Sequence, residues 1–223
     1  MKYVEVRNLK YNNECISFVF FERWNSFYGV DKDFLSILMG TKEYDGYINI
    51  NGNFLKNNNL SDKIYCVNKN DIFFGINLYD ELLMSGDLVS LIDDYIIYFG
   101  LSEYKYLSFD KIPLDKKIIV SILFGVLNNK KYIYLNNVLC FLSKKDRDCI
   151  YYFLIKNNII VFNFTTNPEE LIYSSKVLKL YDYSIYDVKD ISDIKIIDLC
   201  NRLIDYGLLN DKYINIEEVV CNL

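Results

Sequence analysis

The segment YIYLNNVLCFLSKKDRDCIYYFLIKNNIIVFNF, residues 132–164, decides the fold. Its first residues, Tyr132–Leu135, and its last, Ile159–Phe164, are mostly apolar runs of the kind that form buried strands. Between them, Lys144–Lys156 has the spacing of an amphipathic helix. Strands that are apolar throughout and alternate with helices predict an α/β fold, in which a mostly parallel sheet is flanked by helices.

Strand and helix patterns continue on the amino-terminal side of this segment. Tyr3–Arg7 and Cys15–Phe21 read as two strands, and Asn12-Asn13 between them suits a turn. Asp31–Met39 has apolar residues at helical spacing, and Gly40 stands where a carboxyl-terminal cap belongs. The sequence therefore predicts a strand, a short glycine turn and a helix in succession.

The middle of the chain adds two more strands and a helical region. Gly46–Gly52 alternates between apolar and polar residues and is bracketed by glycines, and Ile64–Val67 is a further short strand. Leu78–Phe99 reads as helices with acidic breaks, and Ile118–Leu127 is the most apolar helix candidate. Beyond Asp187 the chain turns acidic, and we expect a helix at Ile191–Leu203 and a strand at Tyr213–Val219.

The composition argues against several classes of protein. The chain has 223 residues, of which 52% are hydrophobic, so it can bury one substantial core. Its net charge of −5 and its scattered lysines argue against a nucleic-acid-binding protein. The longest apolar run is about half of the roughly 20 residues that a spanning helix needs, and no signal peptide is recognisable at the start. With no histidine and six scattered cysteines, we expect reduced thiols, no metal site and a cytoplasmic location.

The order of these segments resembles the ATP-binding cassettes of ABC transporters over about residues 3–183, and it reads most like the exporter type. The matching stretches lie in the order that the family has. They are Tyr28–Gly40 for the phosphate loop and its helix, Asp45–Gly52 for the G-x-I-x-I-x-G hairpin, Val67–Gly75 for the glutamine loop, Ile112–Lys117 for the signature, Tyr132–Asn137 for Walker B and Thr165–Asn167 for the switch.

The resemblance implies a P-loop NTPase-like sheet with an antiparallel β edge and a small helical subdomain. Residues 1–184 would form the ATPase-like domain, with the helical subdomain at about 76–127, and residues 185–223 would be an acidic carboxyl-terminal extension. It also implies partners, namely a membrane permease, a second cassette in a homo- or heterodimer, or both. The chain would then lie peripheral to the membrane, at its cytoplasmic face.

A vestigial nucleotide pocket is expected at Tyr11, Gly29, Lys32, Asp33 and Lys69. By resemblance, Tyr11 stands where the family stacks adenine, and Lys69 stands in place of the coupling glutamine. A working phosphate loop has the pattern G-x-x-x-x-G-K-[ST]. Here the loop is short, and acidic residues flank Lys32 at a helix start, where they complement the dipole and compete with an anion. Packing for Tyr11 and solvent exposure for Lys69 are the plainer alternatives.

The catalytic positions are degenerate at Asn136, Asn137 and Thr166. The family needs two carboxylates at Walker B, one for Mg²⁺ and one for the attacking water, and an amide can neither accept a proton near neutral pH nor bring charge to the metal. Thr166 stands where the switch histidine is expected, and the chain contains no histidine. In the signature, Pro113-Leu114-Asp115 replaces the Ser-Gly-Gly that binds the γ-phosphate of the partner's site.

These losses favour a catalytically degenerate ABC-transporter subunit, which would be a non-hydrolysing structural or regulatory partner rather than an enzyme. Two alternatives remain open. One is a diverged ATPase that still binds ATP with Mg²⁺ through Lys32. The other is an unrelated cytosolic α/β interaction protein, which the absence of a strand, turn and helix at residues 26–40 would favour.

Overall fold

The computed structural model describes residues 3–29, 31–55, 61–86, 88–180 and 183–187. The helix expected at Ile191–Leu203 and the strand expected at Tyr213–Val219 lie outside these residues. Almost all of the expected acidic extension does so too, and the domain boundary at residue 184 remains a prediction.

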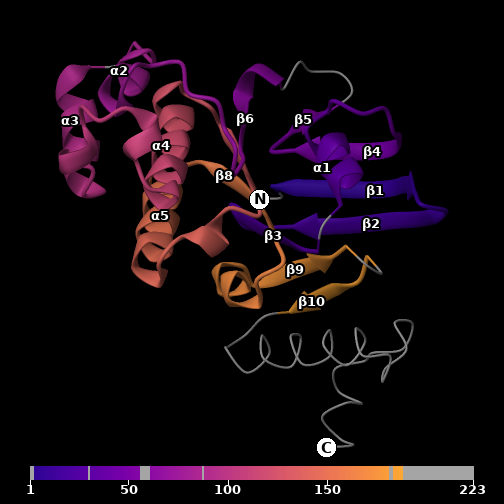
Figure 1. Cartoon of the computed structure of the whole chain (residues 1–223). Helices are drawn as coiled ribbons and strands as arrows, with labels where there is room; N and C mark the ends of the chain where they lie inside the picture. Colours follow the sequence, from indigo (N-terminus) through magenta and orange to yellow (C-terminus); the bar gives the residue numbers. More distant parts are fainter. Residues whose placement is uncertain (1–2, 30, 56–60, 87, 181–182, 188–223) are drawn as a thin grey trace, which may run out of the picture.

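A six-stranded sheet forms the centre of the described structure (Figure 1). Its strands lie in the order β10-β9-β3-β8-β7-β6, and only β10 runs antiparallel to its neighbour. The strands are β3 Trp24–Tyr28, β6 Ile64–Val67, β7 Tyr132–Asn136, β8 Ile160–Thr165, β9 Lys176–Lys179 and β10 Ile185–Asp187. The mostly parallel sheet predicted from the apolar runs is confirmed.

Strand β3 is an element that the sequence pattern did not distinguish from the strand before it. Every one of its five residues is buried, because β3 lies between β8 and β9 and is covered on both faces. The pattern predicted the strand Cys15–Phe21, and only two residues, Glu22 and Arg23, separate its end from Trp24. The chain instead leaves one sheet after Phe20 and enters the other at Trp24.

A second, four-stranded sheet has the order β2-β1-β4-β5 and is antiparallel throughout. Its strands are β1 Val4–Tyr11, β2 Glu14–Phe20, β4 Asp45–Ile50 and β5 Asn53–Phe54. Asn12 and Asn13 turn the first hairpin with φ of 48° and 62°, the conformation that asparagine tolerates in two-residue loops. Gly46 has φ 125°, and a Cβ there would lie 2.6 Å from the Asn8 carbonyl oxygen, so only glycine fits this crossing.

Five α-helices complete the described structure: α1 Lys32–Leu38, α2 Leu78–Leu83, α3 Val89–Tyr98, α4 Leu114–Leu127 and α5 Lys144–Lys156. Figure 1 shows α2 to α5 on one side of the six-stranded sheet, and α1 with the four-stranded sheet on the other. The sheet thereby separates two cores. One contains Trp24, Ile133 and Val161 with residues of α2 to α5, and the other contains Phe27, Tyr134 and Phe162 with residues of α1 and the four-stranded sheet.

Helix α4 is longer than the apolar run that predicted it. It begins at Leu114, directly after Pro113, whose fixed φ suits a helix start and whose missing N–H costs nothing there. The signature-like residues Leu114 and Asp115 therefore lie in the first turn of this helix. Among the helices described, none combines the length with the apolar character that crossing a membrane requires.

Candidate functional site

The expected site residues gather at one edge of the six-stranded sheet, where the parallel strands end. Gly29 follows β3, Asn136 is the last residue of β7, Thr166 follows β8, and Lys69 comes two residues after β6. Ligands of open α/β sheets bind outside these carboxyl ends. Two backbone bonds tie the edge together: Gly29 N donates to Thr165 O at 2.9 Å, and Asn137 N donates to Phe164 O at 2.7 Å.

The strand, turn and helix expected at residues 26–40 are present, with only three residues between β3 and α1. Asp31 is the N-cap of α1, and its Oδ1 accepts from the Asp33 amide at 3.1 Å and from the Phe34 amide at 2.9 Å. In a phosphate-binding loop these amides would face the ligand. Here the chain's own carboxylate satisfies them.

Tyr11 contacts this cap rather than standing free for a base. Its hydroxyl donates to Asp31 Oδ1 at 2.6 Å, and its ring lies edge-on to Phe34 and Tyr183 at centroid distances of 5.7 and 5.9 Å. Burial and the hydrogen bond to Asp31 raise the pKa of Tyr11. In this structure Tyr11 packs against the α1 cap, and its role as an adenine platform stays a prediction.

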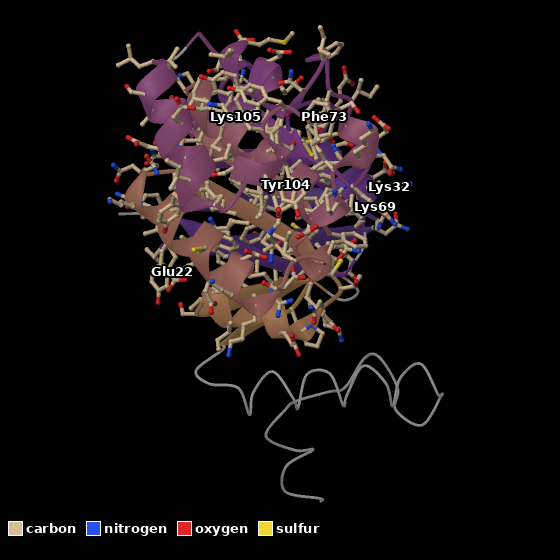
Figure 2. All side chains as sticks on the ribbon, turned by 60° about the vertical axis from the view of Figure 1, so that its left-hand side comes forward. Glu22, Lys32, Lys69, Phe73, Tyr104 and Lys105 are labelled. Atoms are coloured by element: carbon tan, nitrogen blue, oxygen red, sulfur yellow. The ribbon has the colours of Figure 1, made fainter. Side chains whose placement is uncertain are left out.

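The two charged residues at the start of α1 differ in their pairing. Asp33 is exposed and forms a salt bridge with Lys42, whose Nζ lies 2.6 Å from Asp33 Oδ2. Lys32 is exposed and has no ion-pair partner in the described ranges. Figure 2 shows Lys32 and Lys69 on the same side of the molecule. Lys32 is thus a cation at this edge that is free to meet an anion.

Lys69 is directed toward the residues that follow β7. Its Nζ lies 4.7 Å from the centroid of the Phe141 ring, a cation–π distance. The loop that carries Lys69 is held by Asp71, whose carboxylate accepts from the Asn68 amide at 3.1 Å and from the Ser121 hydroxyl on α4. Asp71 is a site residue that sequence reasoning missed, because its partner on α4 is 50 positions away.

The three residues expected at the catalytic positions, Asn136, Asn137 and Thr166, form two hydrogen-bonded contacts. The side-chain oxygen of Asn137 accepts from Thr166 N at 3.2 Å and from Thr166 Oγ1 at 3.3 Å, which joins the Walker B and switch positions directly. Asn136 Nδ2 donates to Asn68 Oδ1 at 2.9 Å, which joins Walker B to the glutamine-loop region. All of these groups are neutral, so the contacts bring no carboxylate to the place where a metal ion or an attacking water would need one.

Glu170 is a second residue that the sequence did not single out. It lies fully buried in a 3₁₀ turn, η5 Pro168–Tyr173, just after the switch position. Asn163 Nδ2 on β8 donates to Glu170 Oε2 at 3.4 Å, and Glu170 Oε1 has no hydrogen-bond partner within the described residues. Burial raises the pKa of Glu170. The sequence signal was weak, because Glu169-Glu170 after Asn167-Pro168 reads as an ordinary solvent-exposed helix start.

The chemistry available at this edge is therefore limited. Within the described ranges, the exposed Lys32 and Lys69 can attract an anion, while the start of α1 is already capped and the amides of Asn136 and Asn137 cannot act as a base. In the described ranges no three His, Cys, Asp or Glu side chains are grouped as a metal site would require.

The fold is shared with solved structures at low sequence identity. The chain superposes on cbiO1 of Clostridium perfringens, part of the ABC transporter complex cbiONQ, with a TM-score of 0.72, 13% identity and coverage of 93% of this chain and 98% of that one. The superposition on an ATP-binding subunit of an ABC transporter has a TM-score of 0.66 and 14% identity, and it covers 92% of this chain and 94% of that one. A chain from an inward-facing transporter assigned to the metal-chelate ABC type superposes with a TM-score of 0.66 and 15% identity, and the match covers 89% of each chain.

By sequence, the chain matches no established family profile and no curated protein. The structural matches cover most of each chain, so they describe the whole domain rather than a shared motif. The chain therefore has the fold of the ATP-binding subunits of ABC transporters.

Proposed function

We propose that this chain is a non-hydrolysing subunit of an ABC-type transporter, a structural or regulatory partner of an active cassette or of a permease. The observation that carries the proposal is the Asn137–Thr166 contact, in which two neutral side chains hydrogen-bond to each other at the Walker B and switch positions. General-base catalysis contributes typically about 10²–10⁴ in rate, and an amide at this position does not provide it.

The α1 cap supports the same proposal. A phosphate at the start of α1 would compete with Asp31 for two amides and would meet its negative charge at close range. A nucleotide could settle there only if Asp31 and Tyr11 moved together, since the two are joined at 2.6 Å.

An exposed apolar surface supports a role in assembly. In the segment between β6 and α2, Ile72, Phe74 and Ile76 are 78%, 77% and 84% exposed. Tyr106, which is also exposed, lies beside this segment, since its ring is 5.8 Å from that of Tyr79 at the start of α2. Apolar side chains that gather in this way commonly mark a contact with another protein. By the resemblance, that protein would be a permease or a second cassette.

The conformation of this surface is fixed from beneath. Glu81 on α2 is buried, and its Oε2 accepts from the Phe74 and Gly75 amides, each at 2.7 Å. A Cβ on Gly75 would lie 2.4 Å from the Glu81 amide nitrogen, so the loop packs closely on α2. A shape held in this way needs little reordering when a partner binds.

Nucleotide titration tests the proposal directly. The purified chain is mixed with a fluorescent ATP analogue and Mg²⁺, and phosphate release is followed in parallel. We expect neither saturable micromolar binding nor multiple turnover. Multiple turnover by the purified chain would disprove the proposal.

The exposed Lys32 favours one second candidate, a diverged ATPase whose missing groups come from a partner. Lys32→Ala separates the two functions in the assembled transporter. The ATPase reading predicts that the variant loses turnover, because the phosphate-binding cation is gone. The structural reading predicts unchanged transport, because Lys32 has no part in it.

Membrane recovery tests the assembly role. In the source cell, the wild-type chain is expected in the membrane fraction, held there by a permease. A variant carrying Phe74→Ser and Ile76→Ser should shift to the soluble fraction while keeping its circular dichroism spectrum, since both side chains point to solvent. Lys10→Ser with Lys42→Ser, changes at exposed positions on the other side of the sheet, is the matched control.

A further inference from the structure

A cavity of about 550 Å³ lies at the end of the sheet opposite to the candidate site. It opens where β3 begins, whereas the residues of the candidate site follow the carboxyl ends of the strands. Figure 2 shows Glu22, which lines the cavity, on the far side of the molecule from Lys32 and Lys69. The volume lies in the range of small-molecule sites, so the cavity can hold a ligand of modest size.

Three aromatic side chains form the wall of the cavity. The Trp24, Tyr151 and Tyr173 rings contact one another at centroid distances of 5.3, 5.4 and 5.0 Å. Trp24 is almost completely buried, and its indole Nε1 has no hydrogen-bond partner in the ranges that the structure describes. This donor is left unsatisfied by the chain itself, which is costly for a buried group.

Glu22 supplies the negative charge of the cavity. Its Oε2 accepts from the Ser175 amide at 3.0 Å, which fixes the carboxylate while leaving its other oxygen available. Within the described residues, Glu22 has no cationic partner. Its charge reaches the aromatic wall, because burial and then Glu22 raise the pKa of Tyr151.

Arg23, the residue after Glu22, also lines the cavity, and its guanidinium is held at the end of α5 by two neutral acceptors. Arg23 donates to the Ile155 carbonyl at 3.2 Å and to the Asn158 side-chain oxygen, both at the end of α5. Asp148 adds a second negative charge behind the wall, since it accepts from the Tyr173 hydroxyl at 2.6 Å. Because the Arg23 guanidinium is turned toward the end of α5 while Glu22 keeps one carboxylate oxygen without a partner, a cation beside the aromatic rings would meet that oxygen.

We infer that this cavity is a binding site for an organic ammonium ion carried on an apolar body, with Glu22 pairing the ammonium group and the Trp24, Tyr151 and Tyr173 rings contacting the apolar body. Carboxylates and aromatic faces are the two groups that recognise such cations in proteins. The inference is independent of the proposed function, since no residue of the candidate site lines the cavity.

The chain carries its own probe for this site. Trp24 is its single tryptophan, so intrinsic indole fluorescence reports on the cavity wall alone. The full chain is titrated with phenethylamine, and 2-phenylethanol serves as the neutral analogue of nearly the same shape. We expect a saturable change in Trp24 emission with the amine at concentrations up to about 10 mM, weaker at high salt, and little change with the alcohol.

Two variants decide the assignment. Glu22→Gln keeps the shape of the side chain and removes its charge, so it should weaken amine binding by about tenfold or more. Glu14→Gln makes the same charge change on an exposed residue of β2 and should leave binding unchanged. Circular dichroism establishes that both variants are folded. The inference fails if the amine gives no saturable change in Trp24 emission or if the alcohol binds equally well. It also fails if Glu22→Gln binds the amine as tightly as the wild type and Glu14→Gln do.

Discussion

Replacing Asp31 by alanine should destabilise the protein through three lost hydrogen bonds. Asp31 Oδ1 accepts from the Asp33 amide, the Phe34 amide and the Tyr11 hydroxyl at 3.1, 2.9 and 2.6 Å. Loss of a helix cap costs about 1 kcal/mol, and a hydrogen bond to a charged group contributes about 1.5–3 kcal/mol. Because Asp31 is half-exposed, the lower end applies, and we expect a loss of about 2–3 kcal/mol.

Urea unfolding followed by circular dichroism measures this loss as a lower midpoint at unchanged slope. For a chain of this length, roughly 2–4 °C in Tm accompanies each kcal/mol, so the thermal midpoint should fall by about 4–12 °C. Asp33→Ala is the matched control, because Asp33 is exposed and its salt bridge with Lys42 contributes at most about 1 kcal/mol. If Asp31→Ala loses no more stability than Asp33→Ala, the α1 cap is not the anchor that its geometry indicates.

Three further measurements test other contacts. The pKa of Tyr11 is raised, so its contribution to stability is complete below its ordinary pKa of about 10 and is lost at higher pH; Tyr11→Phe should therefore lose less unfolding free energy than the wild type between about pH 9 and pH 11. Glu81→Ala should cost about 3–4 kcal/mol in urea unfolding, because two part-buried amides lose their carboxylate acceptor, whereas Asp80→Ala on the same helix should cost about 1 kcal/mol or less. The pKa of Glu170 is also raised by burial, so ionisation opposes folding as pH rises above the ordinary pKa of about 4.5. Glu170→Gln should therefore gain stability relative to the wild type as pH rises above about 4.5, and equal pH profiles for the two proteins would contradict this.

Local pattern was sufficient for most of the secondary structure. The apolar runs at 132–135 and 159–164 and the helix at 144–156 are present as β7, β8 and α5. Asn12-Asn13 predicted the first hairpin turn, because asparagine tolerates positive φ. These features depend on the backbone preferences of one segment and on which of its faces is buried. The residues of that segment determine both.

Boundaries between neighbouring elements were harder to predict. Only a few residues separate β2 from β3, and they end one strand and begin another because the two strands belong to different sheets. Strand β3 pairs with β8 and β9, more than 130 residues further along the chain. A local pattern reports that a strand is buried but not the partner that buries it.

The candidate site was proposed from the order of the sequence segments, but its contacts could not be predicted in this way. The sequence alone establishes that the chain has no histidine and that residues 136 and 137 are amides, because these are matters of residue type. Only the tertiary structure decided that Asp31 binds Tyr11, 20 positions away, and that Asn137 binds Thr166, 29 positions away. The physical reason is that hydrogen bonds act over about 3 Å, and strand register, which no single segment encodes, determines which side chains come that close.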